Sequence, residues 1–194
     1  MFTQKGEIEI WLNQRHTPFL DIAFSILTFM GDGFFVLLVC ILYLFIRFYE
    51  ALVLLLVYIF SGIPVQILKN TLFLGEPRPK VFFENIAQKL HFVKGLEIHS
   101  YNSFPSGHSA TAFAIMLFFA MFLPEKHRNW GGVCCFLIAF LIATSRIYLL
   151  QHFFIDTFVG ALIGTVTAFL VIGFIENRTE LKDKIFWQKR IKLT

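Results

Sequence analysis

Residues 153–175 read FFIDTFVGALIGTVTAFLVIGFI and contain a single charged side chain, Asp156. An α-helix needs about 20 mainly apolar residues to cross the hydrocarbon core of a bilayer, so this stretch predicts a transmembrane helix. The composition of the whole chain agrees, because 57% of its 194 residues are hydrophobic and only 15% are charged. Soluble domains average about 25% charged residues. The sequence therefore predicts a membrane protein.

Further apolar segments approach the length of a span; they are residues 34–48, 51–74, 108–123 and 131–150. An earlier run at residues 19–30 is shorter and contains Asp21, which favours an interfacial or re-entrant helix over a span. We therefore predict an all-α fold, a polytopic membrane helical bundle with five spans plus this short N-terminal helix, or with six spans. No linker or internal repeat divides the chain, so residues 1–194 are expected to form a single integral-membrane domain.

The distribution of basic residues predicts the orientation in the membrane, because Lys and Arg that flank spans stay on the cytoplasmic side. The loop at residues 124–130 is basic, and residues 176–194 form a tail that carries Arg178, Lys182, Lys184, Lys189, Arg190 and Lys192. We expect this loop and the tail to be cytoplasmic, which places the connection at residues 75–104 outside. The net charge of +4 thus indicates the bilayer as a partner and argues against nucleic acid.

Ionisable side chains gather at the outer ends of the predicted spans. Such side chains are costly at membrane depth and are functional candidates by default. The predicted topology brings them to one side of the bilayer from four helix ends: Lys69, Arg78, His108, Arg146, His152 and Asp156. Scattered polar residues would not converge in this way.

The helix predicted to begin near residue 106 is suited to bind a phosphate group. Ser106 is a favourable N-cap, and Gly107 lets the backbone approach a ligand closely. The free N–H groups and the positive dipole end of such a helix attract anions. The cations available to bind the non-bridging oxygens are Lys69, Arg78 and Arg146.

His152 and Asp156 are four residues apart, hence on one face of a helix. A carboxylate in this position can hold the Nδ1–H of the imidazole and direct Nε2 at phosphorus, which is the arrangement that nucleophilic catalysis needs. His108 is then available to protonate the leaving alkoxide. Two histidines with different neighbours can divide the roles of nucleophile and acid.

These residues resemble the three-part signature of the type 2 phosphatidic acid phosphatase superfamily: Lys69 with Arg78-Pro79, then Pro105-Ser106-Gly107-His108, then Ser145-Arg146 with His152 and Asp156. The first part departs from the family pattern, because eight residues instead of six separate Lys69 from Arg78. Thr71 occupies the position with the usual spacing. Lys80 is the alternative to Lys69 as the lysine that contacts phosphate.

The resemblance implies a membrane lipid phosphatase that needs no metal and no cofactor. In this scheme His152 is the nucleophile and forms a phosphohistidine, Asp156 orients it, and His108 is the acid and later the base. The implied phosphate-binding residues are Lys69, Arg78, Ser106, Gly107 and Arg146. Three cysteines, all inside apolar runs, do not have the spacing of a metal site.

The implied substrate is a phosphorylated membrane lipid, such as undecaprenyl pyrophosphate, phosphatidylglycerophosphate, phosphatidic acid or a lipid A phosphate. The expected location is the bacterial cytoplasmic (inner) membrane, with the active site on the periplasmic face. Two other functions use the same residues: transfer of the phosphoryl group to another lipid, and binding or transport of an anion without chemistry. An anion binder needs positive charge but has no need of a carboxylate-oriented imidazole opposite a second histidine, which favours catalysis.

Overall fold

The structure, a computed structural model, describes residues 4–178 and is helical throughout that range apart from its connections. The α-helices are α1 (Glu7–Asn13), α2 (Pro18–Phe29), α3 (Gly33–Leu44), α4 (Phe48–Asn70), α5 (Pro79–Phe82), α6 (Gly107–Phe122), α7 (Arg128–Tyr148) and α8 (Phe154–Glu176). Two 3-10 turns are η1 (Glu84–Lys89) and η2 (Glu125–His127). The predicted all-α bundle is confirmed. The predicted basic tail lies almost entirely outside the described residues.

Three helical segments are long and apolar enough to cross a membrane: Phe48–Asn70, Glu125–Tyr148 and Phe154–Glu176. Helices α2 and α3 meet at a bend of 58° and pass the same test only as a pair, as a broken span or a re-entrant loop. The predicted separate span at residues 34–48 is therefore a helix of 12 residues that follows α2 across this bend. The predicted segment at 108–123 is α6, which has 16 residues.

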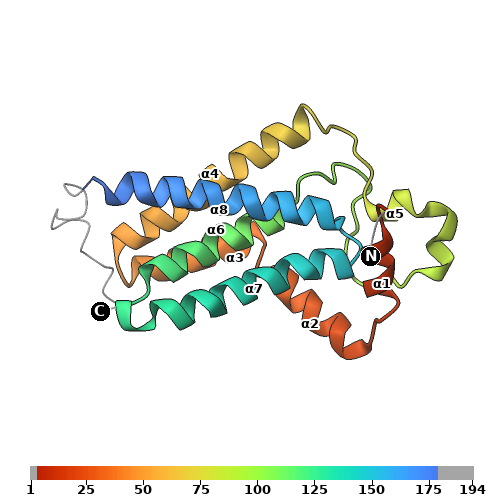
Figure 1. Cartoon of the computed structure of the whole chain (residues 1–194), viewed down its shortest axis with the longest axis horizontal. Helices are drawn as coiled ribbons and strands as arrows, with labels where there is room; N and C mark the ends of the chain where they lie inside the picture. Colours follow the sequence, from red (N-terminus) through yellow and green to blue (C-terminus); the bar gives the residue numbers. More distant parts are fainter. Residues whose placement is uncertain (1–3, 179–194) are drawn as a thin grey trace.

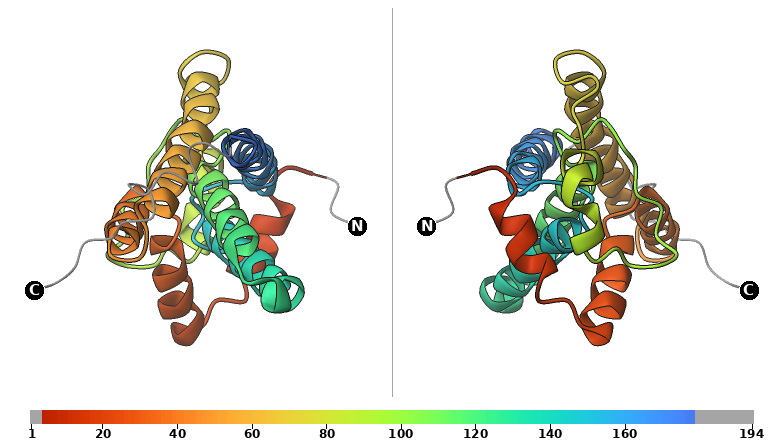
Figure 2. Two further views of the ribbon diagram at one scale, coloured as in Figure 1. Left: turned by 90° about the vertical axis from the view of Figure 1, so that its left-hand side faces the viewer. Right: turned by 90° about the vertical axis from the view of Figure 1, so that its right-hand side faces the viewer.

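Helix α6 lies in the middle of the bundle and packs against α4, α7 and α8, as the end-on views in Figure 2 show. Glycines on α8 permit the closest of these approaches. A Cβ atom added at Gly160 would overlap the carbonyl of Ser106, and one added at Gly164 would overlap that of Ala110. This crossing brings the first turn of α8 against the start of α6, where the main-chain N–H of Ser106 donates to the carbonyl of Asp156 at 2.9 Å.

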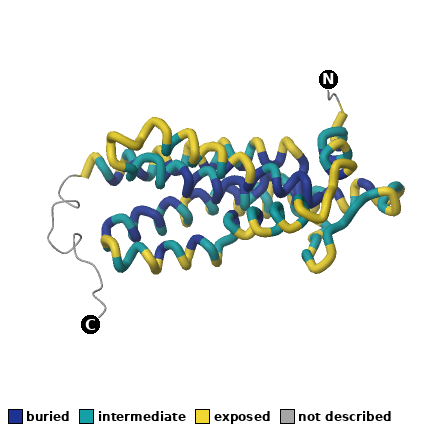
Figure 3. The backbone as a smooth tube through the Cα atoms, turned by 90° about the horizontal axis from the view of Figure 1, so that it is seen from below, coloured by how far each residue is buried: buried dark blue, intermediate teal, exposed yellow. Residues whose placement is uncertain are grey.

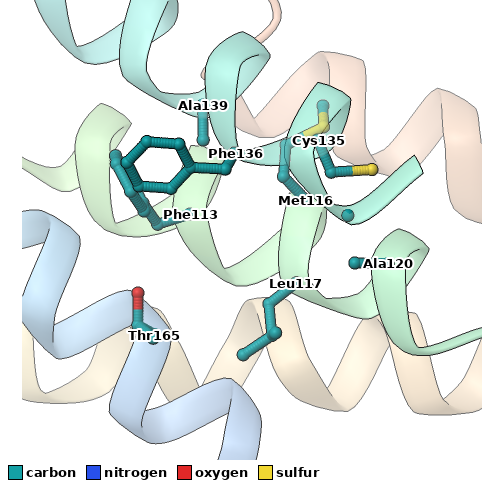
Figure 4. A pocket seen from close by; sticks show the side chains of 9 residues that line it. Phe113, Met116, Leu117, Ala120, Cys135, Phe136, Ala139 and Thr165 are labelled. Carbon is teal, nitrogen blue, oxygen red and sulfur yellow. The ribbon is translucent and has the colours of Figure 1, made fainter. Parts of the chain in front are cut away.

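The outer surface of the bundle is apolar, as expected of helices that face lipid. Large hydrophobic side chains such as Phe34, Phe169 and Leu170 are exposed. Exposed and buried positions alternate along the helices of the bundle (Figure 3). An apolar cavity of about 110 Å³ lies between α6, α7 and α8 and is lined by residues that include Phe113, Phe136 and Thr165 (Figure 4). No charged side chain lines this cavity, so it does not have the properties of a phosphate site.

The ionisable residues predicted to act together do not line this cavity. They lie at one end of the bundle. The last turns of α4 and α7 and the first turns of α6 and α8 all lie at this end (Figure 1). The long connection between α4 and α6 also covers it, together with α1 and α5. The fold thus brings four helix ends into one region, as the sequence predicts.

Candidate active site

A tight turn between α7 and α8 positions His152. The main-chain N–H groups of Gln151 and His152 both donate to the carbonyl of Arg146, at 2.9 and 3.1 Å. Leu150 adopts the left-handed region with φ of 53°, which lets the chain reverse directly after α7. His152 is 1% exposed and its Nδ1 lies 3.5 Å from Oδ2 of Asp156. That distance is within the range of an ion pair and is longer than an ordinary hydrogen bond.

Oδ2 of Asp156 is held from two further directions. The main-chain N–H of Phe153 donates to it at 2.9 Å, so the carboxylate caps the N-terminus of α8. The hydroxyl of Ser103 donates to the same oxygen at 2.5 Å. Ser103 belongs to the connection between α4 and α6 at residues 75–104, which we call the outer connection because the sequence predicts it to lie outside. Ser103 is itself fixed through its N–H, which donates to the carbonyl of Glu76 at 3.1 Å. The aspartate is therefore fixed before any substrate binds.

Two buried arginines flank the histidine. Nε of Arg78 donates to the carbonyl of Tyr101 at 3.0 Å, and its Nη1 donates to the carbonyl of Gln151 at 3.2 Å. Nη1 of Arg146 donates to the hydroxyl of Thr28 at 2.6 Å. Nε of Arg146 is buried and has no hydrogen-bond partner among the described residues. A buried guanidinium N–H without a partner is costly, and a phosphate oxygen would satisfy it.

The structure places Lys69, and not Lys80, beside these arginines. Lys69 is in the last turn of α4, and its Nζ donates to the carbonyl of Asn102 at 3.1 Å. Its charge acts on the same region as those of Arg78 and Arg146. Lys80 is exposed on α5. Thr71, at the usual family spacing, is also exposed and donates its hydroxyl to the carbonyl of Ile67.

The start of α6 offers backbone donors to the same region. Ser106 is the N-cap: its hydroxyl accepts from the N–H of Ser109 at 3.4 Å, and its carbonyl accepts from the N–H of Ala110. Within residues 4–178, the N–H groups of Gly107 and His108 have no hydrogen-bond partner. Free N–H groups at a helix N-terminus form an anion site. Ser106 therefore caps α6 in this structure, and the backbone N–H of Gly107 is available as a donor.

His108 faces this region from the first turn of α6. The charged groups that act on its imidazole include Arg146, His152, Arg78 and Lys69. Its Nε2 lies 3.8 Å from Oδ2 of Asp32. Asp32 is the N-cap of α3 and accepts from the N–H of Phe34 through Oδ1 at 2.8 Å.

Burial is the largest influence on the imidazole of His152. Together with the positive charges of Arg78, Arg146 and Lys69, it lowers the pKa of His152 well below the ordinary histidine value. The ring is therefore neutral in the unliganded protein, and a neutral imidazole has a free lone pair for attack on phosphorus.

All eight predicted site residues lie at this end of the bundle. Their chemical roles stay predictions. Four residues that were not predicted from the sequence hold them in place: Thr28, Asp32, Ser103 and Gln151. Asp32 could have been found, because it is an acidic residue within an apolar stretch. The other three are neutral, and nothing in their local sequence distinguishes them from ordinary polar residues.

Comparison with known proteins places this geometry in a family. The chain matches the PAP2 superfamily over residues 50–180. It is 36% identical over 88 residues to phosphatidylglycerophosphatase B of Bacillus subtilis (strain 168), a match that covers 42% of this chain and 43% of that protein. The chain thus spans less than half the length of this curated relative.

Two crystal structures resemble the whole bundle. Aquifex aeolicus LpxE superposes with a TM-score of 0.73 at 28% identity, covering 89% of this chain and 96% of that chain. The transmembrane PAP2-type phosphatidylglycerolphosphate phosphatase of Bacillus subtilis superposes with a TM-score of 0.69 at 28% identity, covering 88% and 84%. The chain therefore belongs to the PAP2 superfamily and is an integral membrane protein.

Proposed function

We propose that the protein is a membrane lipid phosphatase that hydrolyses a phosphate or diphosphate ester of a lipid through a phosphohistidine intermediate. The observation that carries this proposal is the position of the neutral, buried imidazole of His152, between the carboxylate of Asp156 and the cations Lys69, Arg78 and Arg146. The family supports it, since relatives and solved neighbours include lipid phosphatases.

In the first step Nε2 of His152 attacks phosphorus in line with the lipid oxygen. The P–N bond forms as the P–O bond breaks, and His108 gives its proton to the departing alkoxide. The arginines, Lys69 and the N–H of Gly107 stabilise charge on the equatorial oxygens. Asp156 balances the positive charge that develops on the imidazole ring.

In the second step water attacks the phosphohistidine. His108, now neutral, takes a proton from the water as the new P–O bond forms. The P–N bond breaks, inorganic phosphate leaves, and the neutral imidazole of His152 is restored. Every proton and electron pair in the two steps is accounted for by these two histidines and the water molecule, so the scheme requires no metal ion.

The proposed substrates are phosphorylated lipids of a bacterial envelope: phosphatidylglycerophosphate first, because two similar proteins are named for it, then undecaprenyl pyrophosphate, phosphatidic acid and lipid A phosphates. The proposed topology has the site at the periplasmic face of the inner membrane and the C-terminus in the cytoplasm. It rests on the basic loop at residues 124–130. This loop joins α6 to α7 at the end of the bundle that lies opposite the site. Labelling of a cysteine introduced at the C-terminus in intact cells tests it.

The chemical test measures phosphate released from each of these lipids by purified protein in detergent. His152→Ala should abolish release, and EDTA should leave release by the wild type unchanged. Exposed His99 on the outer connection provides the matched control, His99→Ala, which should retain activity. Trapping of an acid-labile, base-stable phosphoprotein in the wild type, and its absence in His152→Ala, identifies the intermediate. Full phosphate release by His152→Ala would refute the mechanism.

Phosphoryl transfer and anion binding are distinguished in the same assay. A phosphotransferase would release less inorganic phosphate when an acceptor lipid is added and would yield a phosphorylated acceptor instead. An anion binder would bind phosphate but would release none from any of the lipids.

A further inference from the structure

A second group of ionisable side chains lies beside the outer end of α7 and takes no part in the phosphate chemistry. It consists of His16, Asp21 and His91, which come from the α1–α2 loop, the first turn of α2 and the outer connection. One nitrogen or oxygen atom from each of the three lies within 4.8 Å of the others. His91 is 70 residues from Asp21 in the sequence, so only the fold brings it to the other two.

Two of the three residues are held in place by neighbours. The side-chain amide of Asn13 donates to the carbonyl of His91 at 2.7 Å and accepts from its N–H at 2.9 Å, so the backbone at His91 is fixed in both directions. The hydroxyl of Tyr148 donates to Oδ1 of Asp21 at 2.6 Å. This leaves Oδ2 of Asp21 to face Nε2 of His91 at 2.8 Å.

The third side chain, His16, stacks on His91 with ring centroids 3.8 Å apart and an interplanar angle of 9°. It is exposed, so its ring can turn out of the stack at little cost. Metal-ligating side chains are typically oriented by a second set of hydrogen bonds. Tyr148 provides such a bond to the carboxylate of Asp21, and Asn13 fixes the main chain that carries the imidazole of His91.

We propose that His16, Asp21 and His91 form a binding site for a borderline transition-metal ion, of which Zn²⁺ is the type. Two imidazole nitrogens and one carboxylate oxygen match the ligands of Zn²⁺, whereas Mg²⁺ and Ca²⁺ prefer oxygen alone. Oδ2 of Asp21 and Nε2 of His91 lie 2.8 Å apart, about half an ångström closer than the tetrahedral angle of Zn²⁺ needs with bonds of about 2.0–2.1 Å, so a small shift of the side chains completes the geometry. Three protein ligands leave a further position for water.

An ion bound at this site would hold the outer connection in place. The ion would join the N-terminal loop and α2 to the segment that also carries Tyr101 and Ser103, whose groups hold Arg78 and Asp156. A bound ion takes the place of the hydrogen bond between Asp21 and His91. The site acts on the stability of the outer face, and the hydrolytic steps proceed without it.

The test uses full-length, tag-free protein in detergent, treated with EDTA and desalted. Calorimetric titration with Zn²⁺ should give one ion bound per chain and a raised melting temperature, while Mg²⁺ should do neither. His16→Ala and Tyr148→Phe should each lower the Zn²⁺ affinity by at least about 10-fold. Co²⁺ should give visible absorption bands in the wild type that His16→Ala loses.

Two controls keep this test separate from the phosphatase proposal. His127→Ala removes an exposed histidine at the other end of α7 and should leave Zn²⁺ binding unchanged. His152→Ala should lose phosphate release yet bind Zn²⁺ as the wild type does. Absence of stoichiometric Zn²⁺ binding, or binding that His16→Ala leaves unchanged, would overturn the assignment, whatever the result of the phosphatase assay.

Discussion

The carboxylate of Asp32 lies 3.8 Å from Nε2 of His108 and joins the bend between α2 and α3 to the first turn of α6. Asp32 is fixed by its role as the N-cap of α3. An anion at this distance favours the protonated imidazole. The proposed mechanism needs His108 protonated when the lipid alkoxide departs. Asp32 favours that form, and it acts against burial and against the positive charges of Arg146, Arg78 and Lys69, which act on the same imidazole.

We therefore expect Asp32→Asn to lower kcat by about 10–100-fold with little change in KM, because a general acid contributes roughly 10²–10⁴-fold and the variant weakens it without removing it. Asparagine is an equally good N-cap, so α3 should still begin at Gly33 in the variant. In the pH profile of kcat, the loss of activity on the alkaline side should begin at a lower pH in the variant than in the wild type. An unchanged kcat and pH profile would show that Asp32 only caps α3.

The hydroxyl of Ser103 is the closest hydrogen-bond donor to Asp156, at 2.5 Å. Ser103→Ala removes one of the contacts that keep the carboxylate facing His152. We expect kcat to fall about 10-fold, since the N–H of Phe153 still holds the same oxygen. Steady-state phosphate release measures the loss, and Ser100→Ala is the matched control. Ser100 contributes its carbonyl to the N–H of Arg78, and that contact survives the substitution.

The choice between Lys69 and Lys80 can be made by comparing their alanine variants. Lys69 lies among the site cations, and Lys80 is exposed on α5. Loss of one charged contact to the transition state typically costs about 10²–10³-fold. Lys69→Ala should therefore lower kcat/KM by that amount, and Lys80→Ala should change it by less than about 3-fold. The reverse ranking would assign the phosphate contact to Lys80.

The sequence predicted the parts of this site that depend on charge and on periodicity. Long apolar runs identified α4, α7 and α8, and the ionisable residues at their ends identified Arg78, Arg146 and His152. Despite the departure from the family spacing, α4 continues to Asn70 and carries Lys69 in its last turn, and residues 71–75 form turns between this helix and Arg78.

The remaining features depend on contacts between segments that are distant in the sequence. Apolarity alone could not show that residues 18–44 form two helices with a bend of 58° between them. That bend places Asp32 against His108 and Thr28 against Arg146. Ser103 reaches Asp156 only because the outer connection folds back over the helix ends. No local pattern specifies such pairings.

The depressed pKa of His152 predicts how stability changes with pH. In the unfolded chain a histidine has a pKa of about 6.5, whereas burial and the neighbouring cations lower the pKa of His152 well below that in the folded protein. Below pH ~6.5 the unfolded state therefore takes up a proton that the folded state does not. Stability contributed by the neutral ring is present above this pH and is lost as the pH falls.

His152→Asn removes this titration, so the wild type should lose stability more steeply than the variant on acidification, by at most about 1.4 kcal/mol per pH unit. Melting temperatures of both proteins in the same detergent, measured from about pH 8 down to about pH 5, give the two slopes. A constant offset between the curves reflects packing alone and does not affect the comparison. Parallel slopes would mean that the histidine takes up its proton equally in both states, and the neutral nucleophile of the proposed mechanism would have to be abandoned.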